Sequence, residues 1–337
     1  MLHDPTCIGH PGAGKEKLTK TGASSVHTVA ENVMTFVSSG LVTLTSGAAH
    51  CQIAPAAGGA VAAFWWESGG RRIDWLRPAS PGAVARGDAG GMGSFPMVPY
   101  GSRIRDARFL FCGREVVETP ADGTKRHALH GHGWRRDWTV VERSEDRLVL
   151  EYDHAGAAWP WPYRARQSFA LSPEALDITL ELENRSDALM PAGLGFHPFF
   201  PRTPAATVTA RANGVWLTDA EIMPTEHAAV LPPGWDLSRG RRVAELDLDN
   251  VFTGWSGDAV VTWPEHGARL RLSAAQPLLS FLVLYTPRDG DFFCVEPASH
   301  VTDAVNLARE GVADTGLRVL APHASRSARM SLRPELL

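Results

Sequence analysis

The hydrophobic residues of this chain fall in short runs separated by turn residues, from about residue 34 to the end of the sequence. Over residues 177–182, Asp-Ile-Thr-Leu-Glu-Leu, polar and apolar side chains alternate strictly, which is the pattern of a β-strand with one solvated face. The pattern therefore predicts many short strands. Comparable apolar or alternating runs lie at residues 41–45, 59–66, 138–141, 147–152, 167–171, 259–263, 268–272, 279–285 and 329–333.

Helical periodicity is scarce along the chain, and residues 302–309 have the spacing of one short helix. The predicted strands do not alternate with long helices, which argues against a doubly wound α/β fold. We therefore predict an all-β protein, built as a large antiparallel β-sandwich with few short helices.

The two ends of the sequence differ in composition. Residues 1–33 are polar and lack apolar periodicity, so we predict a flexible N-terminal extension. Residues 34–337 contain neither a Gly/Ser-rich linker nor an internal repeat, so we predict a single domain there. Residues 9–15 have the spacing of a phosphate-binding loop, but Glu16 replaces the Ser or Thr that holds magnesium, and no strand precedes it. We predict no nucleotide site.

Composition narrows the class of partner and the compartment. The 337 residues are 44% hydrophobic and 21% charged with a formal net charge of −4, which argues against a nucleic-acid partner. No apolar run reaches the roughly 18 residues that a membrane span needs. The N-terminus lacks a signal-peptide pattern and the cysteines are widely spaced, which favours a cytoplasmic location. The cysteines are Cys7, Cys51, Cys112 and Cys294.

One histidine lies in an apolar and aromatic segment, Gly193-Leu-Gly-Phe-His197-Pro-Phe-Phe-Pro201. Imidazole gains and loses a proton near neutral pH, and Pro198 favours an extended segment over a helix interior. A buried structural histidine and a catalytic histidine fit this segment equally well. The other polar residues among the apolar runs must decide between them.

Basic residues punctuate two further segments. Arg103 follows a stretch rich in proline and glycine, and is either a forked donor to a ligand or a surface ion-pair partner. His127, His130 and His132 suggest a metal site, because positions 130 and 132 would share a face of a strand. No glutamate follows at the spacing such a site needs, and two arginines come next, so we predict no metal.

Two carboxylates have comparable settings. Glu296 follows four apolar residues and precedes Pro297. A carboxylate there lies either at a solvent-facing strand end or at a site where desolvation raises its basicity. Asp249 precedes an apolar run, where an ordinary loop acid is the plainer interpretation.

Together these segments resemble the aldose 1-epimerase (galactose mutarotase) family over about residues 36–335. Each motif is weak alone, but five in the family's order form a specific signal. The segments are Phe95-Pro-Met-Val-Pro-Tyr-Gly-Ser-Arg103-Ile, Leu129-His130-Gly-His-Gly-Trp134, His197-Pro-Phe-Phe200, Asp249-Asn-Val-Phe252 and Cys294-Val-Glu296-Pro297. The resemblance implies the family's β-supersandwich, a monosaccharide substrate (an aldohexose or aldopentose), and neither cofactor nor metal.

The resemblance also implies roles. His197 would be the general acid and Glu296 the general base, while Arg103, His130 and Asp249 would hold the sugar hydroxyls and ring oxygen. Interconversion of anomers needs a proton removed from the C1 hydroxyl and one delivered to the ring oxygen, so that the ring opens and closes on either face. An ionised Glu296 and a protonated His197 are therefore expected, with a bell-shaped pH profile.

The chain departs from the family's pattern at two positions. Ser102 stands where the family usually has Asn, and Asn250 where it often has His. We expect both positions to border the sugar. Phe196, Phe199 and Phe200 lie in the same segment as His197. We expect them to form a wall that keeps water from the ring-opened sugar.

Two other functions fit part of the pattern. Asp249 and Glu296 would suit the carboxylate pair of a retaining or inverting glycosidase, but the histidine and arginine would then lack a chemical role. A non-catalytic sugar-binding or sensing domain would need neither His197 nor Glu296. An anionic sugar stays open because of four arginines, for which exposed strand positions are the plainer interpretation: Arg135, Arg136, Arg164 and Arg166.

Overall fold

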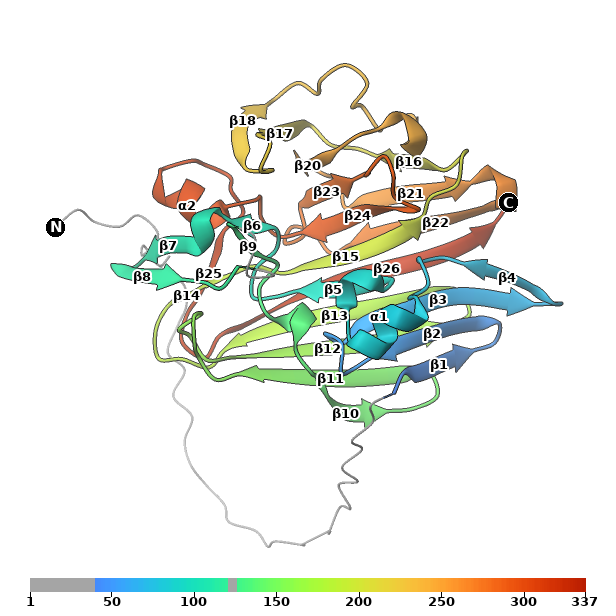
Figure 1. The fold of residues 1–337 in the computed structure, drawn as a ribbon, viewed down its shortest axis with the longest axis horizontal. Helices are drawn as coiled ribbons and strands as arrows, with labels where there is room; N and C mark the ends of the chain where they lie inside the picture. The colour runs from blue at the N-terminus through green and yellow to red at the C-terminus, as the bar shows by residue number, and fades with distance from the viewer. Residues whose placement is uncertain (1–39, 121–125) are drawn as a thin grey trace, which may run out of the picture.

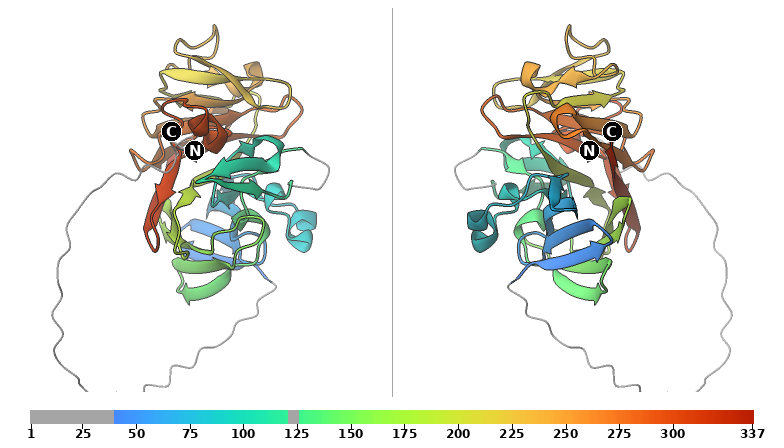
Figure 2. Two further views of the ribbon diagram at one scale, coloured as in Figure 1. Left: turned by 90° about the vertical axis from the view of Figure 1, so that its left-hand side faces the viewer. Right: turned by 90° about the vertical axis from the view of Figure 1, so that its right-hand side faces the viewer.

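The computed structural model describes residues 40–120 and 126–337, and the predicted extension over residues 1–33 lies outside them. Two large antiparallel sheets stack on each other and share one hydrophobic core (Figures 1 and 2). The prediction of a large antiparallel β-sandwich is confirmed. In the described part of the chain, the first sheet has eleven strands and the second has nine.

The eleven-stranded sheet carries the residues of interest at its centre. Its strands, in spatial order, are β1 (Val42–Ser46), β2 (Ala49–Ala54), β3 (Ala60–Ser68), β5 (Ser94–Met97), β15 (Gly195–Pro201), β24 (Phe292–Ala298), β23 (Phe281–Tyr285), β20 (Asp249–Thr253), β17 (Gly214–Thr218) and β18 (Pro224–Ala228). Strand β4 (Arg71–Asp74) pairs with β3 at the side.

The nine-stranded sheet forms the other layer. Its order is β10 (Thr139–Arg143), β11 (Arg147–His154), β12 (Tyr163–Ser172), β13 (Ala175–Asn184), β26 (Ser325–Leu336), β22 (Ala268–Ala274), β21 (Asp258–Trp263), β16 (Thr207–Ala210) and β19 (Arg241–Arg242). Three two-stranded ribbons join β14 (Met190–Ala192) to β25 (Arg318–Leu320), β6 (Arg103–Ile104) to β9 (Ala128–Leu129), and β7 (Arg108–Phe111) to β8 (Arg114–Val117).

Strands β12 and β13 show how the alternating pattern builds the sandwich. Buried and partly exposed residues alternate along both strands, and their register pairs Phe169 with Ile178 and Gln167 with Leu180. A period of two sends every second side chain to the same face, so the apolar ones enter the core and the charged ones meet water. The strand predicted over residues 176–182 is confirmed within β13.

Strands β5, β15 and β24 are buried almost throughout, because the eleven-stranded sheet is covered on both faces here. Phe196 and Phe200 of β15 belong to the core between the sheets, whereas Phe199 joins a second cluster with Phe95 on the opposite face. Helix α1 (Pro81–Arg86) lies over part of that face (Figure 1). The opposite face of these three strands therefore forms a second, smaller interior.

The helix expected over residues 302–309 is present as α2 (Ala304–Arg309). It packs beside β6 and β7, in the group of short ribbons next to the end of β15 (Figure 1). No helix of the described residues is both long enough and apolar enough to cross a membrane. Cys51 and Cys294 are buried free thiols.

Candidate active site

A histidine and a glutamate on adjacent central strands form the heart of the site. The register that pairs Phe199 with Cys294 and Gly195 with Ala298 places His197 opposite Glu296. Their side chains point to the same face, and Nε2 of His197 lies 3.3 Å from Oε1 of Glu296. The two residues are 8% and 2% exposed, so the pair is nearly withdrawn from water.

An ion pair borders this histidine–glutamate pair. Asp249 begins β20, which is separated from β24 by the single strand β23, and its Oδ2 lies 3.6 Å from Nη2 of Arg103 on β6. Both side chains keep about a quarter of their exposure, so they lie where the interior opens to solvent. Burial raises the pKa of Asp249 while Arg103 lowers it.

His130 contacts the pair from the end of β9. It adopts a left-handed backbone conformation (φ 57°) and its ring meets that of His197 edge to face, with centroids 5.1 Å apart. Its Nδ1 accepts a hydrogen bond from the backbone N–H of Ser102 at 3.0 Å, which leaves the proton of the neutral ring on Nε2. Burial first, then the charges of His197 and Arg103, hold the pKa of His130 well below 6.5.

His132 does not share the site, although it lies two residues from His130. The chain leaves strand β9 at Leu129, and Gly131 takes a positive φ of 66° that brings its backbone against Val98. His132 Nε2 instead lies 3.0 Å from Oε2 of the buried Glu118. Residues 130 and 132 are therefore not on a strand, and their imidazoles do not lie side by side on one strand face.

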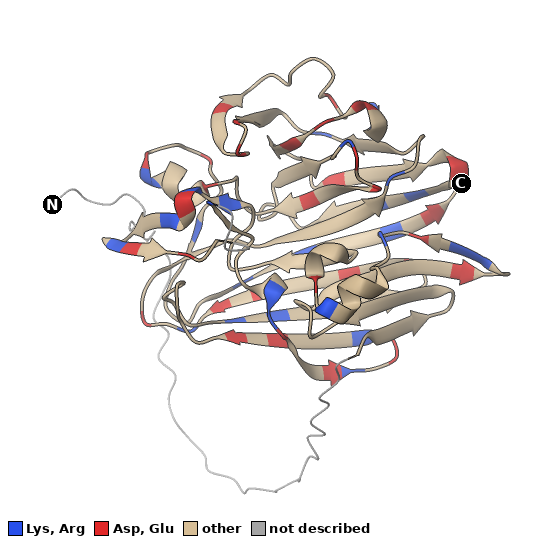
Figure 3. Ribbon diagram, viewed as in Figure 1, with Lys and Arg blue, Asp and Glu red and all other residues tan. Residues whose placement is uncertain are grey.

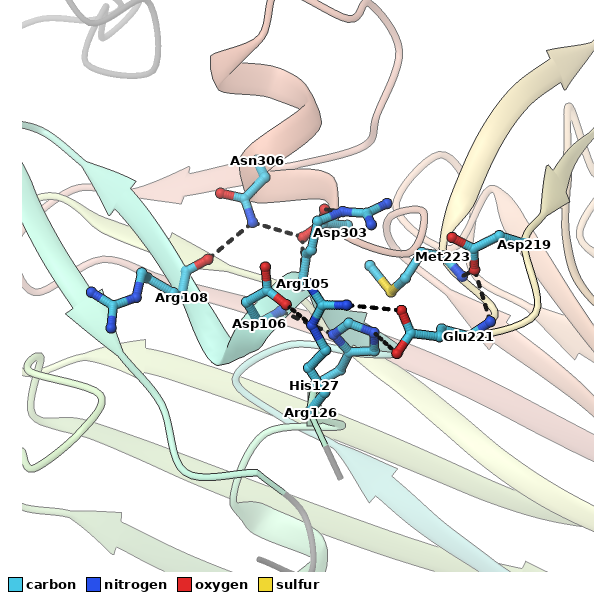
Figure 4. Close-up of polar contacts among 10 residues, drawn as sticks. All are labelled: Arg105, Asp106, Arg108, Arg126, His127, Asp219, Glu221, Met223, Asp303 and Asn306. Carbon is cyan, nitrogen blue, oxygen red and sulfur yellow. Dashed lines mark hydrogen bonds and ion pairs between the residues drawn. The ribbon is translucent and has the colours of Figure 1, made fainter. Parts of the chain in front are cut away.

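The β6–β9 ribbon that presents Arg103 and His130 is anchored at both sides (Figure 4). On one side, the backbone N–H of Arg105 donates to Oδ1 of Asp303 at 3.0 Å, immediately before α2. On the other, Glu221 from the β17–β18 connection lies 3.8 Å from His127 and also pairs with Arg126. These contacts fix the ribbon relative to the large sheet.

His300 supports the same region from beneath. Its Nε2 accepts a hydrogen bond from the backbone N–H of Gly101 at 3.0 Å, and its Nδ1 donates to the carbonyl of Val301 at 2.7 Å. A Cβ at Gly193 would lie 2.2 Å from the ring of His300, so only glycine fits there. This close approach explains why glycine begins the segment that contains His197.

Aromatic rings enclose the imidazole of His197. The ring of Phe199 stacks on it with centroids 4.6 Å apart, and Phe95 lies at 4.4 Å. The expectation that all three nearby phenylalanines wall the site is wrong for Phe196 and Phe200, because the two-residue period of β15 turns them into the core between the sheets.

Burial acts on the protonation of both members of the pair. Desolvation lowers the pKa of His197 to about 3, and Arg77 and Arg103 oppose its positive charge further. Desolvation, followed by the charge of Asp249, raises the pKa of Glu296 well above 4.5. Burial therefore disfavours the charged form of each group, and this opposes the expected ionised glutamate and protonated histidine.

The two positions that depart from the family's pattern have different settings. Ser102 is in the left-handed region (φ 49°), where Asn is better tolerated than Ser, and both its backbone groups bond His130. Asn250 donates its side-chain amide to the carbonyl of Trp216 at 2.9 Å. Its side chain therefore links β20 to β17, and its place at the border of the sugar stays a prediction.

Contacts of three of the four arginines that suggested an anionic sugar are seen in the structure. Arg164 and Arg166 lie on β12 and pair with Asp153 and Glu142, each at 2.8 Å, on the outer face of the nine-stranded sheet. Both lie on a strand, as expected, and their side chains are partly exposed. Arg135 lies over the ring of Trp134.

A third group lies beside the pair, since ligand atoms of His197, Cys294 and Glu296 lie within 4.8 Å of one another. Such a set is compact enough to hold an ion. The cations Arg77 and Arg103 oppose positive charge at His197. Their charges also weaken the attraction of this set for a divalent cation.

The sequence interpretation assigned no role to four residues around the pair: Arg77, Phe95, Cys294 and His300. A period of two counted back from Glu296 places Cys294 on the same face, so that position was readable once the strand was known. Phe95 lay within a recognised motif. Arg77 and His300 gave no signal, because each reaches the site from a loop whose path depends on the whole fold.

The structure is a β-sandwich with a buried histidine–glutamate pair at the centre of one sheet, and an arginine, an aspartate and a second imidazole rim this pair. The chain belongs to the aldose 1-epimerase family, whose model matches residues 40–333. The uncharacterized protein YphB of Escherichia coli K12 is 32% identical over 286 residues, 83% of this chain and 94% of that protein.

Solved structures agree with this membership. A candidate aldose 1-epimerase from Escherichia coli K12 superposes with a TM-score of 0.80 at 31% identity, covering 88% of this chain and 99% of its own. A galactose mutarotase-like protein from Clostridium acetobutylicum has a TM-score of 0.76 at 20% identity, covering 88% and 95%, which shows the likeness of fold.

Proposed function

We propose that this protein is an aldose 1-epimerase that interconverts the α and β anomers of a free aldose. The observation that carries the proposal is the pair formed by Nε2 of His197 and Oε1 of Glu296, 3.3 Å apart and buried between aromatic rings. An acid and a base at this separation both reach the oxygens bonded to one anomeric carbon. Membership in the family supports the same reaction.

The reaction moves one proton from the C1 hydroxyl to the ring oxygen. With the shared proton on His197, Glu296 accepts the hydroxyl proton while the imidazolium protonates the ring oxygen, and the C1–O5 bond breaks to give the aldehyde. Rotation about C1–C2 and reversal of the transfers close either anomer. Each positioned group contributes about 10²–10⁴ in rate, without a nucleotide or a covalent intermediate.

Sugar binding has to favour the charged forms of the pair, because burial disfavours both of them. Arg103 and the Nε2–H of His130 are the donors that support this change, since they stabilise an ionised carboxylate or a developing oxyanion nearby. The carboxylate of Asp249 accepts hydrogen bonds from sugar hydroxyls at the rim of the site. Either tautomer carries one proton, so activity should span the pH range between the two macroscopic pKa values of the pair.

The sign of the pH dependence follows from these shifts. On the acid side, activity falls when the pair takes up a second proton, which goes to His197. This happens well below the ordinary histidine pKa of 6.5. It falls on the alkaline side when the pair loses its proton, above the ordinary carboxyl pKa of 4.5. The result is a broad bell whose acid limb lies lower than that of an ordinary histidine.

Polarimetry or NMR of freshly dissolved α-D-glucose and α-D-galactose, extended to a panel of pentoses and L-sugars, tests the proposal. Wild-type protein should speed the approach to anomeric equilibrium, and His197→Asn should slow it by about 10²–10⁴ while sugar binding stays measurable. If no aldose equilibrates faster with wild-type protein, the epimerase assignment fails.

The same samples separate the alternatives. Sugar binding without acceleration would make the protein a sensing or binding domain on this fold. Release of an aryl alcohol from an aryl glycoside, dependent on Asp249 and Glu296, would make it a glycosidase. Full mutarotase activity in His197→Asn would reject the role given to the histidine.

A further inference from the structure

Arg77, in the loop after β4, is a half-buried cation near the pair. No carboxylate among residues 40–120 and 126–337 lies within ion-pair distance of its guanidinium, which instead donates to the carbonyls of Gly90 at 2.7 Å and Met92 at 2.8 Å. Burial is the main influence on its pKa and lowers it. The charges of Asp291 and Asp88 oppose this shift from beyond ion-pair distance. A desolvated cation held without a direct ion pair is costly to keep.

The guanidinium of Arg77 is stacked on two aromatic rings. Its Cζ lies 4.1 Å from the ring centre of Phe199 and 4.5 Å from that of Phe292. The backbone N–H of Arg77 also donates to the carbonyl of Phe199 at 2.8 Å. Cation–π attraction in a site shielded from water is worth about 2 kcal/mol or more, so Arg77 fixes both the backbone and the ring of Phe199.

Phe199 is also the ring that stacks on His197, with centroids 4.6 Å apart and planes 20° from parallel. A single aromatic ring therefore joins the Arg77 cation to the imidazole of His197. The sequence of contacts is Arg77, Phe199, His197 and Glu296, and each neighbouring pair is in direct contact.

We propose that Arg77 is a positioning residue for His197: through Phe199 it fixes the orientation of the imidazole, and its charge opposes the imidazolium, so that the imidazolium releases its proton readily. This inference rests on the proposed epimerase function for its catalytic meaning. The ring oxygen of a sugar is a weak base, and a strong acid protonates it more readily than a weak one.

Other charged and titratable groups face His197 as well. They are Glu296 and Cys294 on β24, Arg103 on β6, His130 after β9, and Asp249 on β20 beyond β23. Arg103 is paired with Asp249, whose negative charge partly offsets its field at the imidazole. Arg77 has no carboxylate within ion-pair distance among the described residues, and Asp88 and Asp291 act on it only from farther away.

The direct test is an NMR titration of the His197 imidazole in the full-length chain, in wild type and in Arg77→Met. Methionine keeps an unbranched apolar stem against Phe199 and Phe292 but removes the charge. The pKa of His197 should rise by about one unit in Arg77→Met, and the acid limb of the mutarotation profile should move upward with it. An unchanged pKa in the folded variant would overturn the proposal.

Two further variants keep the test decisive. Arg77→Lys retains the charge without the planar fork, so the pKa of His197 should stay within a few tenths of a unit while kcat falls severalfold. A rise equal to that of Arg77→Met would show that charge is not the cause; unchanged kcat would reject the positioning role. Arg72→Met is the matched control, because Arg72 also covers a ring, Trp65, but is exposed.

The titration separates this inference from the proposed function, since it needs no turnover. If no aldose is a substrate and Arg77→Met still raises the pKa of His197, the link between the two residues stands and the epimerase function fails. If wild type is active and the titration is unchanged, the function stands and the role of Arg77 fails.

Discussion

The two sheets of the sandwich handle charge in opposite ways. Residues of both charge signs lie along β11, β12 and β13 of the nine-stranded sheet (Figure 3). Arg164 pairs there with Asp153 and Glu151, and these side chains are partly exposed to water. The centre of the eleven-stranded sheet holds Glu296 at 2% exposure, against His197.

Both regions are built from antiparallel strands. They differ in how far their charged side chains are solvated. A charge on the solvated face keeps its hydration and its ion pairs contribute little, typically below about 1 kcal/mol. A titratable group between two covered faces loses its hydration, so its pKa moves and its proton becomes available for transfer. Coverage of the second face by loops and α1 therefore converts an ordinary sheet into a candidate site.

The largest expected effect comes from removing one carboxylate in each region. Glu296→Gln should lower the rate of mutarotation by about 10²–10⁴, because the base is lost without a change of shape. Glu151→Gln, the matched change on β11, should leave the rate unchanged. Polarimetry on both purified variants measures the contrast; equal losses would mean that burial of the carboxylate is not what makes it catalytic.

A second contrast concerns stability and its pH dependence. Because the pKa of Glu296 is raised in the folded state, its proton stabilises folding fully below pH 4.5, and this contribution is lost as pH rises through the folded pKa. Gln has no such loss. At pH 8, the free energy of unfolding of Glu296→Gln should therefore exceed that of wild type. The difference should be about 1.4 kcal/mol for each unit by which folding raises the pKa of Glu296.

The control for this stability prediction is again Glu151→Gln. Its ion pairs with Arg164 and Arg166 are partly exposed, so the change in the free energy of unfolding should stay within about 1 kcal/mol. Urea titrations at pH 5 and pH 8 give both quantities. A wild type that loses no stability relative to Glu296→Gln between these values would contradict the burial effect assigned to the glutamate.

The smallest effect concerns the backbone at the edge of the site. Ser102 has a φ of 49°, and Asn tolerates this region better than Ser. Ser102→Asn should raise the free energy of unfolding by about 1 kcal/mol or less, with His130 still bonded by the backbone of residue 102. Thermal unfolding checks this expectation; a lower melting temperature would mean that the larger side chain clashes with the buried surroundings.

The fold was predictable because alternation and turn residues survive as local signals in strands such as β13. The neighbours Arg103, His130, His197, Asp249 and Glu296 were also found, through motifs. The positions of Phe196 and Phe200 were not predicted correctly, because these depend on which strand face each side chain takes. The position of Arg77 and the pKa shifts of the pair depend on burial by distant loops, which no short segment encodes.

The central pairing of β15 with β24 also has a kinetic consequence. The histidine and the glutamate are about 100 residues apart in sequence, and such non-local strand pairs form slowly because a long loop must close first. Local hairpins such as β12–β13 can form before this step. Recovery of catalytic activity on refolding should therefore lag behind recovery of sheet structure, and enzyme turnover becomes a reporter of the last strands to meet.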